Sequence, residues 1–322
     1  MTSKALTVSA VLCTYNGERY LPDLLASLRS QSRPLDQLIV SDDASTDGTV
    51  ALLEAELPRF KCATVLLRSG HNVGAAANFS ASLGQATGDV VLPCDQDDLW
   101  QPSKVERLAD VLEGTSSAVV FHNAQCISAN GRPTGQLLAD LLDKAPLPRG
   151  PDAFRRLLRR NLVSGCTMAL RRKFLLNALP VPAGFMHDEW LALMAAARDE
   201  IVFVDEPLIS YRLHGGNALG LRDIGARAAV TQRLGDVGGQ RARKIARLEG
   251  LNERLSQRRE GMRPEALDYL NEAIGHLKSR QGLPQAMVGR IPIVMREWRA
   301  GRYRRHSGGV LSALRDALRG SA

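Results

Sequence analysis

The sequence lacks several features that mark particular classes of protein. Its five cysteines are scattered and form no CxxC pair, which argues against a zinc site and a disulfide framework and favours reduced thiols. No run of apolar residues approaches the ~18 needed to span a bilayer. The first residues hold one lysine and only a short apolar stretch, so we expect no signal peptide and a cytoplasmic protein.

Glycine is scarce where two classes of nucleotide-binding enzyme need it. The first predicted strand, residues 6–13, runs into CTYNGERY, which has a single glycine. A nucleotidyltransferase would want a glycine-rich, basic loop there, and a dinucleotide dehydrogenase would need GxGxxG, whose glycines let the backbone approach the phosphates. The dehydrogenase is therefore excluded, and the nucleotidyltransferase stays only as a weak alternative.

The first 122 residues alternate between strand-like and helix-like segments. Apolar, β-branched runs predict strands over residues 6–13, 37–41, 62–67, 89–94 and 118–122. Helical spacing of apolar residues predicts helices over residues 18–30, 49–57, 74–85 and 102–112. This order is typical of an α/β fold with a mostly parallel sheet and helices on both faces.

The pattern is less regular after residue 128. It predicts helices over residues 152–160 and from residue 188, and strands over residues 163–170, 201–204 and 208–213. Basic helical stretches follow at 224–258, 264–281 and 308–318. We therefore expect a catalytic domain over residues 1–220 and a basic helical C-terminal region over residues 221–322.

Charge is divided unevenly between these two parts. Residues 221–322 carry 21 Lys and Arg against 10 Asp and Glu, a net charge of +11, whereas the first 220 residues carry a net −3. The excess is mixed with Trp298, Tyr303 and the pair Val310 and Leu311. That mixture suits peripheral docking on an anionic membrane. A merely solvated helical face is the alternative, and without a recognised nucleic-acid motif we expect no nucleic acid partner.

Four polar segments follow predicted strands: TYNG, SDDASTDGT, RSGHNVGAAANF and DQDD. Open parallel sheets bind ligands at the carboxyl ends of their strands, so these segments predict one ligand site. In the tetrad of residues 95–98, three carboxylates repel one another unless a cation or hydrogen-bond donors offset them. Mg²⁺ or Mn²⁺ binds through such carboxylates together with substrate phosphates. A lone DxD is more often a solvated acidic turn.

The motifs TYNGERYL, SDDASTDGT, HNVGAAANF and PCDQDDLW, in this order and spacing, resemble the family 2 glycosyltransferases. Within that family they are most similar to the bacterial rhamnosyltransferase-like branch. The resemblance covers residues 8–220 and implies a GT-A type nucleotide-sugar-binding fold. It also implies an inverting, metal-dependent transfer of a sugar, rhamnose being the first candidate, in bacterial surface polysaccharide synthesis. The donor would be of the dTDP or UDP type, and the acceptor a saccharide or a lipid-linked saccharide. The basic C-terminal region would place the protein peripherally at the inner face of the cell membrane.

The resemblance also implies roles for the residues at the strand ends. Thr14 and Tyr15 would lie at the base pocket, and Asp42 or Asp43 would accept from the pyrimidine N3–H or a ribose hydroxyl. Asp95 would face the ribose or the sugar, and Asp97 would ligate Mg²⁺ or Mn²⁺. In the segment SDDASTDGT, Ser45 and its neighbours can also cap the helix that follows.

Two later segments complete the expected site. His187-Asp188-Glu189-Trp190 opens a predicted helix, and inverting transfer needs a carboxylate base that removes the acceptor proton. The family's acidic residue falls on Asp188, with Glu189 as the alternative base and helix capping as the alternative role. In YRLHGG, the resemblance places His214 near the diphosphate as a metal or phosphate ligand, although alone it would be a turn histidine. Arg212 would neutralise charge on the leaving group.

A rival from another class is a non-catalytic nucleotide-sugar-binding scaffold within a polysaccharide assembly complex. Intact acidic residues at positions 97 and 188 argue against it. Assaying donor hydrolysis separates the enzyme from the scaffold.

Overall fold

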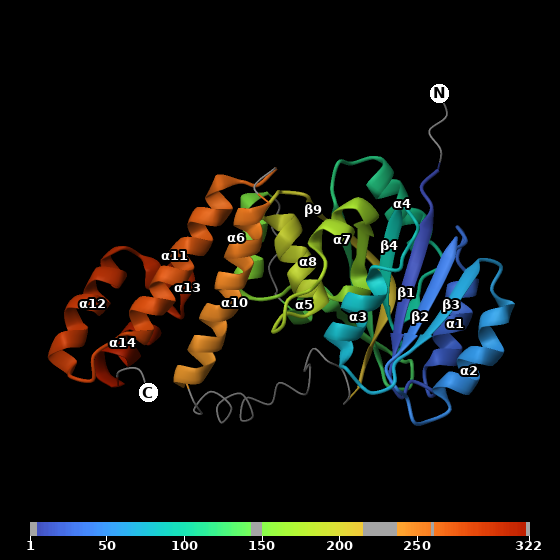
Figure 1. The fold of residues 1–322 in the computed structure, drawn as a ribbon, viewed down its shortest axis with the longest axis horizontal. Coiled ribbons are helices and arrows are strands. Elements are labelled where there is room, and N and C mark those ends of the chain that lie inside the picture. Colours follow the sequence, from blue (N-terminus) through green and yellow to red (C-terminus); the bar gives the residue numbers. More distant parts are fainter. Residues whose placement is uncertain (1–4, 143–149, 215–236, 259–260, 320–322) are drawn as a thin grey trace. The chain divides into compact units, whose positions relative to one another are not determined.

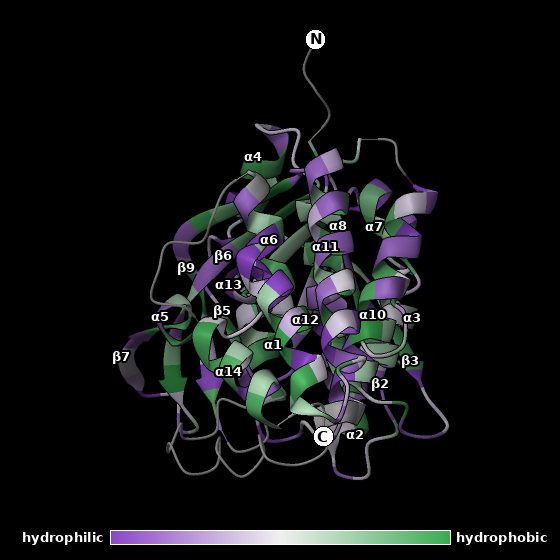
Figure 2. Ribbon diagram, turned by 90° about the vertical axis from the view of Figure 1, so that its left-hand side faces the viewer, coloured by the Kyte–Doolittle hydropathy of each residue, from purple (hydrophilic) through white to green (hydrophobic). Residues whose placement is uncertain are grey.

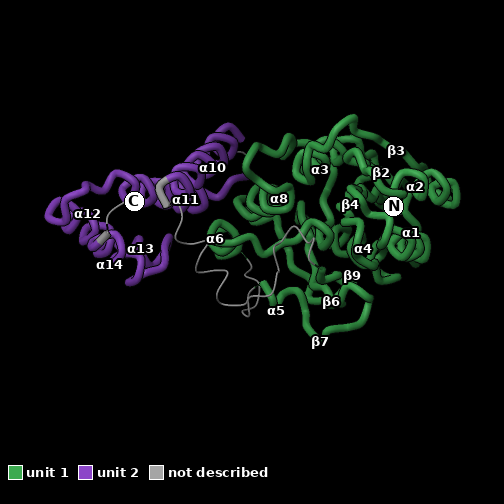
Figure 3. The backbone as a smooth tube through the Cα atoms, turned by 90° about the horizontal axis from the view of Figure 1, so that it is seen from below, with its two compact units in different colours: residues 1–218 green, residues 219–322 purple. Residues whose placement is uncertain are grey.

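The structure is a computed structural model, and it describes residues 5–142, 150–214, 237–258 and 261–319. The chain forms two compact units, unit 1 over residues 1–218 and unit 2 over residues 219–322 (Figure 3). The predicted boundary at residues 220 and 221 lies outside the described residues, as does the first part of the helix predicted over 224–258.

Unit 1 is built on a nine-stranded sheet (Figure 1). Its strands are ordered β3-β2-β1-β4-β8-β6-β9-β5, and β7 pairs with β6. Their bounds are β1 Val8–Thr14, β2 Gln37–Asp42, β3 Ala63–Arg68, β4 Val90–Asp95, β5 Leu99–Trp100, β6 Val119–Ser128, β7 Pro133–Leu137, β8 Met168–Arg171 and β9 Ile201–Leu213.

The helices of unit 1 cover this sheet. Their bounds are α1 Leu21–Arg29, α2 Thr49–Glu56, α3 Ala75–Leu83, α4 Lys104–Glu113, α5 Leu138–Leu142, α6 Pro151–Arg159, α7 Arg172–Ala178 and α8 His187–Ala196. All seven residues of β1 are buried, as expected for a central strand with helices on both sides. The predicted apolar stripe of α1 is buried through Leu21, Leu24, Leu25 and Leu28. The α/β class with a mostly parallel sheet is therefore confirmed.

Strand direction gathers the polar loops on one edge of the sheet. Strands β1, β2, β3 and β4 are mutually parallel. Strand β8 runs antiparallel to both β4 and β6, so the two reversals restore the direction, and β9 is parallel to β6. The carboxyl ends of β1, β2, β4, β6 and β9 therefore lie at the same edge.

Three strand predictions were inaccurate, and the one over residues 118–122 ended six residues short of β6. Residues 163–170 were expected to form one strand, but Gly165–Thr167 is a 3-10 turn and only Met168–Arg171 is extended. The Thr167 amide and hydroxyl both donate to the Ser164 carbonyl, at 2.9 and 2.7 Å, which bends the chain there. The strands expected at 201–204 and 208–213 are one strand, whose register with β6 shifts at the predicted break.

Unit 2 contains the helices α10 Val237–Gln257, α11 Pro264–Gln281, α12 Met287–Arg299, α13 Arg302–His306 and α14 Gly309–Arg319. The predicted helices at 264–281 and 308–318 agree with α11 and α14, whereas α12 and α13 were not predicted. Helix α12 contains Pro292 and follows a Gly- and Pro-containing segment, which conceals its helical pattern. The described part of the chain has no helix with the length and apolar character to cross a membrane.

Candidate active site

Two aspartates at the end of β2 are buried and accept hydrogen bonds from the loops around them. Asp42 is 1% exposed, and its Oδ2 accepts hydrogen bonds from the hydroxyls of Thr14, at 2.8 Å, and Ser45, at 2.6 Å. Asp43 is 2% exposed and accepts the backbone N–H groups of Val73 and Gly74, each at 2.8 Å. These two carboxylates therefore build the edge on which a ligand would lie.

The loop after β1 is tied to the acidic tetrad that follows β4. The side chain of Gln96 accepts from the Tyr15 N–H at 2.9 Å and donates to the Tyr15 carbonyl at 3.0 Å. The Tyr15 side chain itself is 46% exposed. Since Thr14 is in register with Asp42, and Cys13 with Asp95, the predicted donor-binding residues of β1, β2 and β4 lie side by side.

Asp97 and His214 come together from segments 117 residues apart. Asp97 Oδ2 and His214 Nε2 are separated by 2.6 Å, and the two side chains keep 16% and 19% of their surface exposed. The imidazole packs beside the Tyr20 ring, at a centroid distance of 5.1 Å. The structure therefore pairs the two residues that were expected to hold the metal.

Arg212 fixes the tetrad against β9. Its side chain is 3% exposed, its Nε donates to the Asp97 carbonyl at 2.8 Å, and its backbone N–H donates to Asp98 Oδ1 at 3.0 Å. Its guanidinium carbon lies 4.7 Å from the centroid of the Tyr20 ring. Arg212, predicted to neutralise the leaving group, is thus held by contacts that shape the turn.

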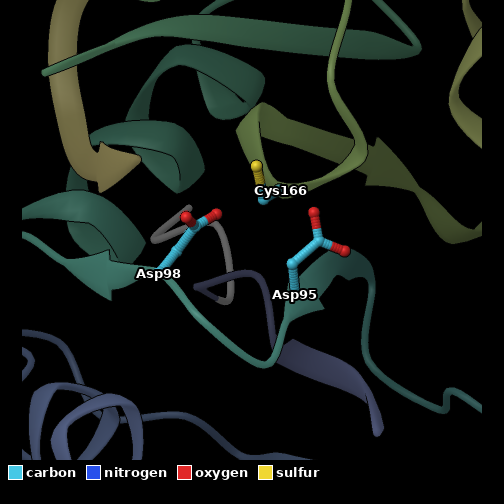
Figure 4. Close-up of side chains that lie close together, drawn as sticks. All are labelled: Asp95, Asp98 and Cys166. Atoms are coloured by element: carbon cyan, nitrogen blue, oxygen red, sulfur yellow. The ribbon is translucent and has the colours of Figure 1, made fainter. Parts of the chain in front are cut away.

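Behind the turn lies a cluster formed by Asp95, which is partly buried, and by Asp98 and Cys166, which are buried; their ligand-type atoms are all within 4.8 Å of one another (Figure 4). Burial, followed by the Asp97 and Asp95 carboxylates, raises the pKa of Asp98 well above its usual range. Burial also raises the pKa of the Cys166 thiol. Lys104, fully buried beside this cluster, donates to the Cys166 carbonyl at 2.6 Å and lies 3.8 Å above the Trp100 ring.

The chemistry of these donors decides which group fits a hard cation. Mg²⁺ and Mn²⁺ prefer accessible, charged oxygens, so a thiol and a fully buried carboxyl whose pKa is raised are poorer ligands for them. Asp97 and His214 are partly exposed. The carboxylate oxygen of Asp97 and the imidazole nitrogen of His214, 2.6 Å apart, would offer a divalent ion two ligands. The partly exposed pair of Asp97 and His214 therefore fits the expected metal better than the cluster of Asp95, Asp98 and Cys166.

Asp188 occupies the first turn of α8, where the close packing of His187 places it. A Cβ on Gly165 would lie 2.3 Å from His187 Nε2, so this histidine requires glycine at position 165. The His187 ring also stacks on Phe79, with centroids 4.0 Å apart, and burial lowers its pKa to about 3. A neutral, packed imidazole thus anchors the start of the helix.

The carboxylate of Asp188 is 6% exposed, and its Oδ1 accepts the Glu189 N–H at 2.6 Å. Burial is the main cause that raises its pKa to about 7. Burial, followed by the charges of Asp97 and Asp188, also raises the pKa of Asp95. Asp188 therefore lies within electrostatic range of the tetrad, and its pKa matches that of a base working near neutral pH.

Several residues of this site were not predicted. Gln96, Asp98, Lys104, Cys166 and Gly165 organise the loops, and only the positions of Gln96 and Asp98 within the tetrad signalled any of them in advance. Cys166 and Gly165 belong to the segment that was predicted as a strand, which concealed the turn they form.

A sheet of this topology, with its acidic tetrad at the common edge, defines the GT-A class of fold. Residues 9–179 match the family model described as glycosyl transferase family 2. This match covers more than half of the chain, and the chain belongs to glycosyl transferase family 2.

Individual relatives agree with this assignment. The dTDP-rhamnosyl transferase RfbG of Shigella flexneri is 29% identical over 225 residues, covering 65% of this chain and 73% of the relative. An uncharacterized glycosyltransferase of Nostoc sp. is 26% identical over 226 residues, covering 66% of each chain. The chain spans 59% of the length of an uncharacterized Mycobacterium tuberculosis relative. Residues 1–349 of S. aureus TarS, solved with UDP-GlcNAc, share the fold at 18% identity and a TM-score of 0.58, covering 92% of both chains.

Proposed function

We propose that unit 1 transfers a sugar, with inversion, from a nucleoside-diphosphate donor to an acceptor hydroxyl in bacterial surface polysaccharide synthesis. The observation that carries this proposal is the position of Asp188, a buried carboxylate with a pKa of about 7 near Asp95. Relatives named for dTDP-rhamnosyl transfer and for teichuronic acid biosynthesis support the polysaccharide context. They make dTDP-rhamnose the first donor to test, with UDP sugars next.

In this reaction the acceptor oxygen forms a bond to the anomeric carbon of the donor sugar, while the bond from that carbon to the diphosphate oxygen breaks. The electron pair of the broken bond leaves with the nucleoside diphosphate, and the acceptor proton passes to the carboxylate of Asp188. Attack from the face opposite the leaving group inverts the anomeric configuration.

We assign Asp97 and His214 to hold Mg²⁺ or Mn²⁺. When bound, such an ion would neutralise the negative charge of the diphosphate leaving group. Thr14 and Tyr15 stand at the nucleotide side of the edge. Asp42 and Asp43 act there chiefly by ordering the loops that contact the base and ribose, and Asp95 faces the donor sugar. Arg212 acts by holding the tetrad in place. Unit 2 makes peripheral contact with an anionic membrane, which would suit a lipid-linked acceptor.

The test compares Asp188→Asn with Glu189→Gln in the full chain. Asp188→Asn should keep donor and metal binding nearly intact and lower turnover by about 10²–10⁴. Glu189→Gln should cost much less, since one helical step of about 100° turns its side chain away. NMR of the product should show an inverted anomeric centre. An active Asp188→Asn variant beside a crippled Glu189→Gln would move the base by one residue, and retention of configuration would overturn the mechanism.

A further inference from the structure

Unit 2 exposes two stripes of large apolar side chains. Thirteen such side chains are exposed in the described parts of the chain, and eight of them lie on α12 and α14. The clearest members are Val288, Ile291 and Met295 on α12, and Leu311, Leu314 and Leu318 on α14. Within each helix they are three or four positions apart and therefore share a face. They are between 41% and 82% exposed, and such patches mark interaction sites.

The core of unit 2 does not account for these stripes. The same two helices bury different residues, Val294 and Ala313, in a small core with Leu283 and Tyr303. Helices α12 and α14 pack against each other, and both carry apolar residues in Figure 2. Each of the two helices therefore has two sets of apolar side chains, one buried in the core of unit 2 and one exposed.

Within the segment that carries the stripes, residues 283–319, the exposed charge has a single sign. Residues 283–319 contain eight arginines, no lysine and only two acids, Glu297 and Asp316. Both acids are interior, at 1% and 0% exposure. Glu297 bonds to His276 at 2.8 Å and to Arg302 at 2.9 Å. Asp316 bonds to Arg280 at 2.5 Å and to the Tyr303 hydroxyl at 2.8 Å.

Because the carboxylates of Glu297 and Asp316 are buried and paired, the exposed charge of this segment is cationic. Arg296, Arg299, Arg304 and Arg315 are all exposed. Arginine presents a planar fork of donors that matches phosphate oxygens and is less strongly hydrated than lysine. The segment therefore carries exposed arginines, which can bind phosphate, and exposed apolar side chains on the same two helices.

We propose that the outer faces of α12 and α14, here called the α12–α14 face, dock on an anionic phospholipid bilayer. The apolar stripes would enter the boundary of the acyl chains, and the arginines would bind the lipid phosphates. A second copy of the chain would bring arginine against arginine, and a nucleic acid would leave the leucines exposed. An anionic bilayer matches both the charge and the apolar stripes.

This inference rests on the membrane contact proposed above for unit 2, but not on the sugar-transfer chemistry. The test is co-sedimentation of the full chain with phosphatidylcholine vesicles, with or without 30% phosphatidylglycerol as the probe, without donor or metal. The variants are Leu311→Ser with Leu314→Ser, and Arg315→Gln. Their matched controls are Val65→Ser with Leu176→Ser, exposed apolar positions in unit 1, and Arg243→Gln, an exposed arginine of α10.

The leucine variant should lower the partition coefficient at least tenfold, and Arg315→Gln should lower it about fivefold, the equivalent of about 1 kcal/mol per basic residue. Both controls should bind like the wild type, and binding should weaken with salt. Unchanged vesicle binding of the leucine variant would overturn the proposal. A wild-type dimer that the leucine substitutions dissociate would also overturn it, because the face would then bind a second copy of the chain. Transfer to a soluble acceptor should be unaffected by the leucine variant, so failure of vesicle binding and failure of the proposed catalysis are read separately.

Discussion

Replacing Asp188 by Asn should stabilise the folded protein while it disables the reaction. The carboxyl group is 6% exposed, and its pKa is raised from 3.8 to about 7, chiefly by burial. The folded state therefore holds the proton more tightly than the unfolded state does. Ionising the group costs folding free energy, and an amide of the same shape avoids that cost while it can still accept the Glu189 N–H.

The sign and the pH window follow from the two pKa values. An acid with a raised folded pKa leaves stability highest below its unfolded pKa of 3.8, lowers it as the pH rises toward 7, and has no further effect above that value. A shift of about 3 units corresponds to ~4 kcal/mol at most. For a domain of this size each kcal/mol moves the Tm by about 2–4 °C, so Asp188→Asn should gain up to roughly 8–16 °C at pH 8.

The assay is thermal unfolding of the full chain in EDTA at pH 4, 5, 6, 7 and 8, with Glu189→Gln as the matched control in the same helical turn. The gain of Asp188→Asn over the wild type should be small at pH 4, grow up to pH 7 and then level off. The control should show no comparable trend. A lower Tm for Asp188→Asn at pH 8, or a difference that does not change with pH, would refute the inference that this carboxylate is held at an energetic cost.

Three further outcomes are expected. The kcat/KM should rise about tenfold per pH unit below pH 7 and level off above it, because only ionised Asp188 accepts the proton; a flat profile from pH 5 to 8 would rule this out. Asp97→Ala should abolish EDTA-sensitive donor binding in calorimetry, and metal-enhanced binding that survives in the variant would remove Asp97 from the metal site. Lys104→Met takes the donor from the Cys166 carbonyl but also removes a buried charge, whose pKa burial lowers from 10.5 to about 8. That charge costs stability below pH 8 and less as the pH rises toward 10.5, so in urea titrations the variant should compare better with the wild type at pH 7 than at pH 10, and a difference equal at both pH values would contradict this.

The sequence predicted those parts of the fold that local patterns encode. Strands β1, β2 and β4 are fully or almost fully buried runs, and α1 has regular apolar spacing, so their positions could be read directly. The strand order could not, because β8 enters the sheet between β4 and β6 from a distant part of the chain. Pairing at such separation depends on tertiary packing rather than on periodicity.

The candidate site shows the same division. The tetrad, the SDDASTDGT segment and His214 could be found from composition and position at strand ends. The sequence could not predict which aspartates accept hydrogen bonds from loop amides. The partners of Asp43, for example, are the N–H groups of Val73 and Gly74, some thirty residues away. Every residue except proline has a backbone N–H, so the residue type does not show which one donates to a carboxylate.

The acidic residues of the site thus fall into two groups with different energetics. Asp42 and Asp43 are satisfied by hydroxyl and amide donors, so they stabilise the loops in the absence of any ligand. Asp188 is buried and Asp95 is partly buried, and burial, followed by the charges of Asp97 and Asp188, raises the pKa of Asp95. A cation held at Asp97 would reduce this repulsion and favour the ionised form of Asp95. Binding of donor and metal should therefore release protons near neutral pH and stabilise unit 1 beyond the contacts that the ligand itself makes.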